Sequence, residues 1–231
     1  MKDFLVRAGA LVQAIGLELA VSYAGLALYG LAAVKQLIMS QYDRVLDVSP
    51  SNVTIQLETH DDHAHICFKI HELRWTDLPT DACARRAAVA AEWERYFNDE
   101  FNPVLEQVSA AGGLKPDLIW NQYGSRVLYV MEYVRGIMPQ GPMLKQIEDD
   151  YLLLASLPPE TFNRKRGNPF SHTPSYIDNP YKPGSPLMIR SGCCMWYRRE
   201  AGEKCYSCPI LKGPERERMK AEIEAKVAQE A

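Results

Sequence analysis

The stretch LAVSYAGLALYGLAAV, residues 19–34, decides how the first part of this chain folds. Its sixteen residues carry no charge and lie between Glu18 and Lys35. A helix that spans a bilayer needs about 20 predominantly apolar residues, so this stretch is short for that role. It also contains two glycines, two tyrosines and a serine. We therefore predict buried helices of a globular core, with a signal peptide or a helix resting on a membrane surface as the open alternatives.

The apolar spacing on either side of this stretch predicts an α+β fold. Apolar residues recur at helical spacing from about residue 3 to residue 39, which predicts two helices with a break near Ser22–Gly25. Residues 52–75, NVTIQLETHDDHAHICFKIHELRW, instead alternate between apolar and polar side chains. This alternation predicts a β-hairpin whose turn is the polar run at 58–62.

The rest of the chain reads mostly as helix. A helix should begin at Thr80 or Asp81 and stop near Asn102–Pro103, and a short one should then end at Gly112–Gly113. Apolar residues recur at helical spacing again at 115–136 and 142–157. Residues 158–186, rich in proline, asparagine and serine, are predicted to form a loop, and the last residues a charged helix. We predict a mostly helical α+β fold with a hairpin or small antiparallel sheet and a C-terminal cysteine-cluster segment. The expected units are a helical α+β domain at 1–186, a cysteine-containing segment at 187–213 and a charged helix at 214–231.

Composition sets limits on function. The chain has 231 residues, of which 47% are hydrophobic and 24% charged, as in ordinary soluble globular proteins. A net charge of −3 offers no basis for a nucleic-acid binder held by phosphate contacts. We expect a cytoplasmic protein and leave open an association with the membrane.

Four of the six cysteines lie in SGCCMWYRREAGEKCYSCPI, residues 191–210: Cys193, Cys194, Cys205 and Cys208. A chain this long can form a stable core without disulfide bonds, which disfavours a disulfide role for these cysteines. A thiol redox pair of the thioredoxin type is disfavoured as well, because no βαβ unit precedes the Cys-x-x-Cys. Adjacent cysteines reach one site only if the backbone turns, and Gly192 is free to take a positive φ there. A vicinal pair fits zinc layouts poorly but suits a [2Fe–2S] cluster, whose two irons each need two thiolates. Spacing thus favours an iron–sulfur site, with zinc, disulfides or free thiols still open.

The neighbours of these cysteines suit a cluster. Five residues would exclude water, namely Met195, Trp196, Tyr197, Tyr206 and Pro209, and three would offset the negative charge, namely Arg198, Arg199 and Lys204. The other two cysteines, Cys67 and Cys83, read as buried small side chains.

The pattern Cys-Cys-x10-Cys-x2-Cys resembles the signature of the FhuF-type ferric siderophore reductases. The segment LIWNQYGSRVLYVMEYV, residues 118–134, is similar to that family's Trp-Asn segment, here Trp120 and Asn121. The resemblance implies a [2Fe–2S] cluster on Cys193, Cys194, Cys205 and Cys208. The segment 187–213 would then bind the cluster, and the domain at 1–186 would bind the siderophore. The resemblance also implies one-electron reduction of a ferric siderophore, with the hydroxamate type expected, and release of Fe(II) in the cytoplasm. Electrons would come from a separate donor, such as a ferredoxin, a flavin reductase or a small reductant, and the protein could associate peripherally with a membrane importer.

The chemistry so implied needs no acid or base, which agrees with the lack of a convincing catalytic triad, carboxylate pair or nucleotide fingerprint. Five residues are predicted to bind substrate: Trp120, Arg126, Tyr197, Arg198 and Arg199. The aromatics near residue 120 read equally as helix core. Two rival functions stay open, a four-cysteine zinc-stabilised interaction module and a [2Fe–2S] electron-transfer or iron-sensing protein without a siderophore site.

Overall fold

The computed structural model describes residues 1–60 and 63–230. The fold is α+β, as predicted: mostly helical, with antiparallel pairs of short strands. The N-terminal half contains α1 (Lys2–Leu11), α2 (Glu18–Tyr42), β1 (Arg44–Leu46), β2 (Val53–His60), β3 (His63–Ile70), β4 (Trp75–Asp77), α3 (Ala82–Arg95) and a π-helical turn (Tyr96–Phe101). The remainder contains α4 (Asn102–Ala111), α5 (Asp117–Trp120), α6 (Tyr123–Ile137), α7 (Pro142–Ser156), a 3-10 turn (Pro159–Phe162), β5 (Tyr176–Ile177), β6 (Leu187–Met188) and α8 (Gly213–Glu230).

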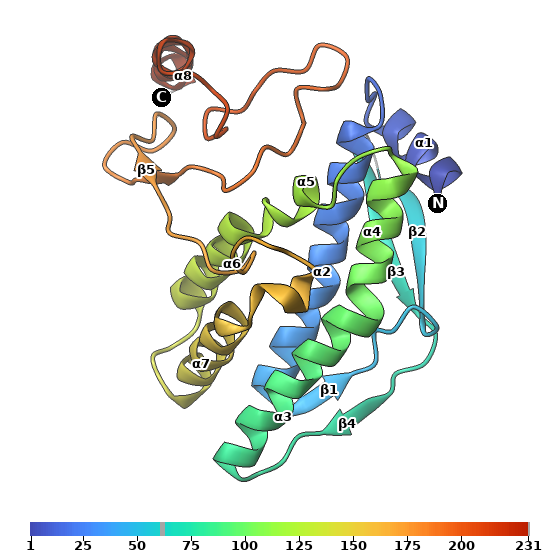
Figure 1. Cartoon of the computed structure of the whole chain (residues 1–231). Helices are drawn as coiled ribbons and strands as arrows, with labels where there is room; N and C mark the ends of the chain where they lie inside the picture. Colours follow the sequence, from blue (N-terminus) through green and yellow to red (C-terminus); the bar gives the residue numbers. More distant parts are fainter. Residues whose placement is uncertain (61–62, 231) are drawn as a thin grey trace.

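Helix α2 is the central element of the bundle, and α1, α4, α5, α6 and α7 pack against it (Figure 1). It runs unbroken through residues 22–25, so the predicted break there is wrong, and the chain instead turns between α1 and α2 at residues 12–17. Gly25 serves close packing, because a Cβ on it would lie 2.5 Å from Ile119 Cγ2 of α5. By length and composition α2 is the one helix among the described residues that could cross a membrane, a test that core helices also pass. Half of its most apolar window is buried inside the protein, as expected for a core helix.

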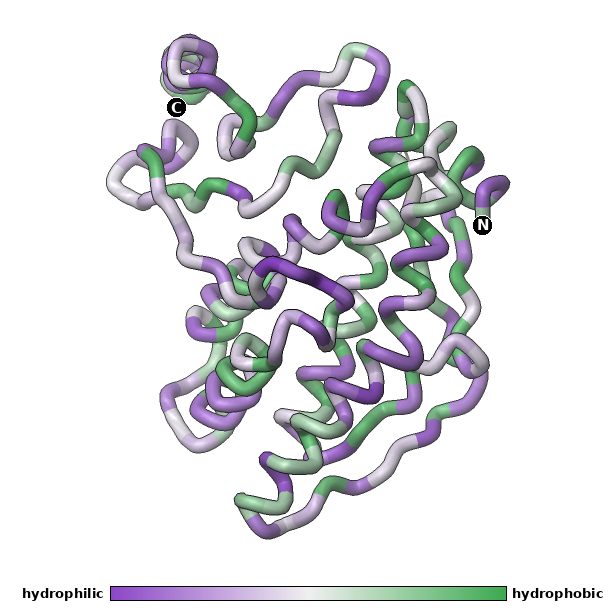
Figure 2. Tube along the Cα trace, in the orientation of Figure 1, coloured by the Kyte–Doolittle hydropathy of each residue, from purple (hydrophilic) through white to green (hydrophobic). Residues whose placement is uncertain are grey.

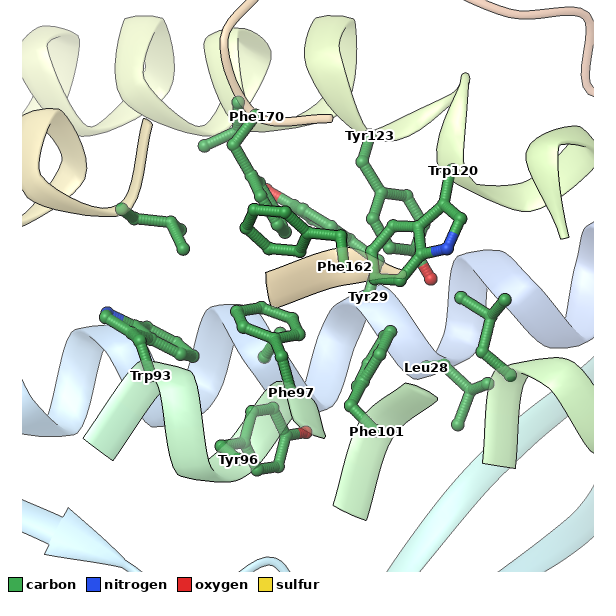
Figure 3. Packing of buried hydrophobic residues seen from close by; sticks show 14 of the residues in the cluster. Leu28, Tyr29, Trp93, Tyr96, Phe97, Phe101, Trp120, Tyr123, Phe162 and Phe170 are labelled. Carbon is green, nitrogen blue, oxygen red and sulfur yellow. The ribbon is translucent and has the colours of Figure 1, made fainter. Parts of the chain in front are cut away.

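An aromatic cluster forms the centre of the core (Figure 3). Phe97 is fully buried in it, with its ring centroid 4.7 Å from that of Phe162 and 5.4 Å from that of Trp93. The rings come from α2, α3, the π-helical turn, α5, α6, the 3-10 turn and the loop that follows. Burying rings this large supplies much of the hydrophobic free energy of folding and holds α5 and α6 against α2.

The helix signals read from the sequence are largely confirmed. Asp81 caps α3, since its carboxylate accepts a hydrogen bond from the Ala84 N–H at 2.9 Å. The expected stop at Asn102–Pro103 is not a stop, because the chain continues through the π-helical turn into α4. Pro103 lies in the first turn of α4, where its missing N–H costs nothing. Gly113 takes a positive φ of 69° after the end of that helix, as predicted for a helix terminus.

The predicted hairpin is β2 paired antiparallel with β3, in a register that runs from Val53 opposite Ile70 to His60 opposite His63. Part of the expected turn, residues 61–62, lies outside the described residues. Two shorter antiparallel pairs, β1 with β4 and β5 with β6, complete the strand content of the described chain. The closing helix is α8, which lies apart from the helical bundle and carries hydrophilic residues along much of its length (Figures 1 and 2).

Candidate metal centre

The cysteine segment is held together by backbone hydrogen bonds between its two ends. The Arg190 N–H donates to the Ser207 carbonyl at 3.0 Å, which brings the start of the segment beside the Cys-x-x-Cys turn. Within that turn the Cys208 N–H donates to the Cys205 carbonyl at 2.9 Å. The vicinal cysteines are tied to the core, since the buried Ser22 hydroxyl of α2 donates to the Cys194 carbonyl at 2.8 Å.

Gly192 is required for close packing, and it does not use its freedom to take a positive φ. A Cβ on Gly192 would lie 2.7 Å from the carbonyl carbon and oxygen of Asn121, so only glycine fits against this backbone. Positive φ values in the segment occur at Met195, with 59°, and at Ala201, with 50°. Next to the glycine, the Ser191 hydroxyl oxygen accepts a hydrogen bond from the Ser125 N–H of α6 at 2.9 Å. The segment is thereby fixed to the adjoining ends of α5 and α6.

The four thiols lie in two pairs, and each pair takes one cysteine from each half of the motif. The sulfurs of Cys193 and Cys208 are 3.6 Å apart, and the thiols of Cys194 and Cys205 are hydrogen-bonded to each other. Two irons with two thiolates each are what a [2Fe–2S] cluster requires. The two thiol pairs therefore fit a binuclear cluster, with one pair for each iron.

Arg190 is the charged residue that the sequence analysis missed. Its Nη1 lies 3.0 Å from Cys194 Sγ. The hydrogen bond from Cys205 and the positive charge of Arg190 lower the pKa of the Cys194 thiol to about 5, whereas burial raises the pKa of Cys193 to about 11. Cys194 is thus the thiol that is already deprotonated near neutral pH and ready to bind metal. In the sequence, the one indication that Arg190 lies near the thiols is its position three residues before Cys193.

The cations predicted to offset the cluster charge are used elsewhere. Arg198 pairs with Glu18 at 3.0 Å. Arg199 stacks on the Trp196 ring, 4.5 Å from its centroid, and donates to Gln13 Oε1. Lys204 pairs with Glu215 of α8 at 3.3 Å. These contacts anchor the segment to the corner between α1 and α2 and to α8, so the charge beside a thiol comes from Arg190.

The predicted substrate-binding residues fall into separate places. Trp120 is 2% exposed in the aromatic core and does not line either cavity beside Cys194. Arg198 and Arg199 make the anchoring contacts just described, and Tyr197 is half-buried beside them. Arg126 is exposed on α6 and lines two cavities next to Cys194.

These two cavities make part of the centre accessible. One, of about 290 Å³, is lined by Tyr23, Arg126, Arg190, Cys194, Trp196 and Cys205, among others. The other, of about 190 Å³, shares Arg126, Arg190 and Cys194 and is also lined by Tyr129. The Cys194–Cys205 side of the centre therefore opens to a cavity, while Cys208 is buried. Of the remaining cysteines, Cys67 is half-buried and Cys83 is exposed, so the expectation of a buried side chain is wrong for Cys83.

Residues 190–209 match the family model of the FhuF 2Fe-2S C-terminal domain. The cysteine segment is similar to that domain. The resemblance seen in the sequence and the expected [2Fe–2S] cofactor are thereby confirmed. Arg190 is the first residue of the match, so the cation beside Cys194 belongs to the FhuF-like segment.

The chain is also similar to the ferric siderophore reductase of Escherichia coli (strain K12), with 24% identity over 168 residues. The aligned region is 73% of this chain and 56% of the relative, so the chain spans little more than half of that protein's length. No solved structure matches the chain. The ferric siderophore reductase activity in the relative's name is that of the longer protein.

Proposed function

We propose that this protein is a ferric siderophore reductase, which reduces the Fe(III) of a bound chelate by one electron and so releases Fe(II). The observation that carries the proposal is the cavity of about 290 Å³ beside the centre, with Cys194 and Cys205 in its wall. When bound, the [2Fe–2S] cluster supplies one electron at a time. The cavity would bring an acceptor next to Cys194 and Cys205, two of the residues that would hold the cluster.

The residues around this cavity suit an organic iron chelate. Trp196 is 43% exposed and presents an aromatic surface, and Arg126 presents a guanidinium. Pockets that enclose small molecules measure about 300–1,000 Å³, so this cavity encloses only part of a siderophore. The chelate would lie at the mouth, with its iron outside the ligand set of the protein, and electron transfer would be outer-sphere.

Reduction suffices to release the iron. Siderophores hold Fe(III) through hard oxygen ligands, and Fe(II) binds such ligands much more weakly, so ligand exchange then frees it. One electron converts Fe(III) to Fe(II) without a proton transfer at carbon, so no general acid or base is needed. We infer a hydroxamate-type chelate, a cytoplasmic site of action and a separate donor, a ferredoxin, a flavin reductase or a small reductant. Peripheral association with a membrane importer is part of the same proposal.

The test mixes anaerobically reduced protein, freed of reductant, with a ferric hydroxamate and with a ferric catecholate chelate. Recovery of the oxidised visible spectrum, with one Fe(II) trapped per electron, is expected for the hydroxamate. The Ga(III) form of the same siderophore has the same charge and shape but accepts no electron, so it should leave the reduced spectrum unchanged. Reoxidation by neither ferric chelate would indicate an electron carrier without a siderophore site. A colourless protein with stoichiometric zinc would refute the proposal outright.

A matched pair of variants tests the cavity itself. Arg126→Gln should weaken the apparent binding of the chelate while leaving the reduction potential unchanged, because Arg126 lines the cavity and no hydrogen bond joins it to a thiol in the described chain. Arg135→Gln, on the same helix but paired with Glu148 on the surface, is the control. Equal kinetics in the two variants would remove Arg126 from the substrate site.

A further inference from the structure

A third cavity, of about 330 Å³, is lined by Ser191, the residue before Gly192. The rest of its wall comes from the end of α5, from Gly124 of α6 and from the proline-rich loop between Arg164 and His172. None of the four cysteines lines it, so it is distinct from the cavities beside the candidate metal centre. An inference about it is therefore independent of the proposed function.

Arg164 is the unusual residue in this wall. Its side chain is only 12% exposed. Nη2 donates to Asn121 Oδ1 at 3.0 Å and pairs with Asp117 Oδ1 at 3.3 Å, whereas Nε and Nη1 are buried without any hydrogen-bond partner. A buried donor on a charged group that lacks an acceptor is strongly unfavourable and is rare in native proteins. Two of the three guanidinium nitrogens therefore lack an acceptor among the described residues of the chain.

Two further residues extend the same chemistry. His172 packs its Cβ against Gly124 of α6, and its Nε2 is buried without a partner. Arg166 is exposed at the rim and makes no ion pair with any described residue. The acid nearest to Arg164 is Asp117, whose side chain is 63% exposed and therefore well screened by solvent. The cavity thus combines excess positive charge with unused donors.

We propose that this cavity binds a small oxyanion, a carboxylate or a phosphate, through Arg164, Arg166 and His172. Water alone supplies acceptors but no negative charge, whereas an oxyanion supplies both and forms charge-assisted hydrogen bonds with guanidinium groups. A volume of about 330 Å³ admits a phosphate ester or a small polycarboxylic acid. The cavity walls come from three separate parts of the chain, so the bound anion joins the proline-rich loop to α5 and to the start of the cysteine segment.

Calorimetric titration of the cluster-loaded, oxidised protein tests this site. Sodium phosphate and sodium citrate are each titrated against sodium chloride at equal ionic strength. We expect the heat of binding to saturate at one site for at least one of the two oxyanions, and we expect no saturable binding of chloride. Stronger binding of phosphate would identify a phosphate ligand, and stronger binding of citrate a carboxylate ligand.

Variants locate the site on these residues. Arg164→Gln should weaken binding at least about tenfold, because it removes a charge-assisted donor. Arg166→Gln, at an exposed position where folding is not at risk, should weaken binding severalfold, while Arg135→Gln should bind like the parent. Absence of saturable binding for both anions, retention of full affinity in both loop variants, or an equal loss in Arg135→Gln would overturn the proposal.

Discussion

Replacing Arg190 with glutamine is expected to lower the reduction potential of the [2Fe–2S] centre. Nη1 of Arg190 lies 3.0 Å from Cys194 Sγ. The reduced centre carries one more negative charge than the oxidised centre, so a cation at this distance favours reduction. Glutamine keeps a polar side chain of similar length in the half-buried site but removes the charge.

The size of the shift follows from this contact. Two unit charges 3.0 Å apart interact by about 5.5 kcal/mol at an effective dielectric constant of about 20. The added electron is spread over the centre, and Cys194 is one of its four ligands, so we assign about a quarter of that energy to Arg190. The result is about 1.4 kcal/mol, which for one electron corresponds to about 59 mV.

A redox titration followed by visible absorption measures the midpoint, with iron and sulfide counted in each preparation to confirm equal loading. Arg199→Gln is the matched control, because it removes the same charge from the same segment at a residue that stacks on Trp196 and bonds Gln13. Its shift should stay below about 20 mV, since its charge is partly exposed and screened. An unchanged or raised midpoint in Arg190→Gln, or equal shifts in the two variants, would refute the reasoning.

Three further outcomes are expected. Cys194→Ser should abolish the incorporation of iron and sulfide. Cys83→Ser, at the exposed start of α3, is the control and should leave the visible spectrum unchanged. An equal loss of iron and sulfide in both variants would contradict the assignment of Cys194 as a ligand. Gly192→Ala places a Cβ 2.7 Å from the Asn121 backbone and should lower the free energy of unfolding in urea by about 1–3 kcal/mol. Gly136→Ala, on an open face of α6, is the control and should leave the free energy of unfolding equal or higher. Equal free energies of unfolding in the two variants would argue against the close approach at Gly192. Burial raises the pKa of Glu92, but hydrogen bonds and positive charge from Arg95 and Lys35 outweigh it and hold this pKa below its ordinary value. Ionised Glu92 therefore stabilises the fold above pH about 4.5, and this stabilisation is lost as the pH falls through the lowered pKa. Glu92→Gln should therefore be less stable than the parent at pH 7, with the difference in unfolding free energy closing below pH 4; a constant difference would count against the ion pair.

Local patterns in the sequence were sufficient for much of this protein. The alternation at residues 52–75 predicts the hairpin because successive side chains of a strand face opposite sides. Asp81 predicts the start of α3 because a cap bonds an N–H only three residues away. The vicinal cysteines and the Cys-x-x-Cys turn predict a cluster because ligand spacing is itself a local property.

Only the tertiary structure decided which groups meet across long sequence separations. Gly25 looked like a helix break, but its role depends on Ile119 lying against it. Arg190 and Arg198 each lie four residues from Cys194 along the chain, and only the folded structure shows that Arg190 contacts the thiol while Arg198 pairs with the distant Glu18. The unpartnered nitrogens of Arg164 are visible only once α5 and the proline-rich loop are in place. Charges and close packing act through space, so their partners are set by how the helices pack on α2 rather than by neighbours along the chain.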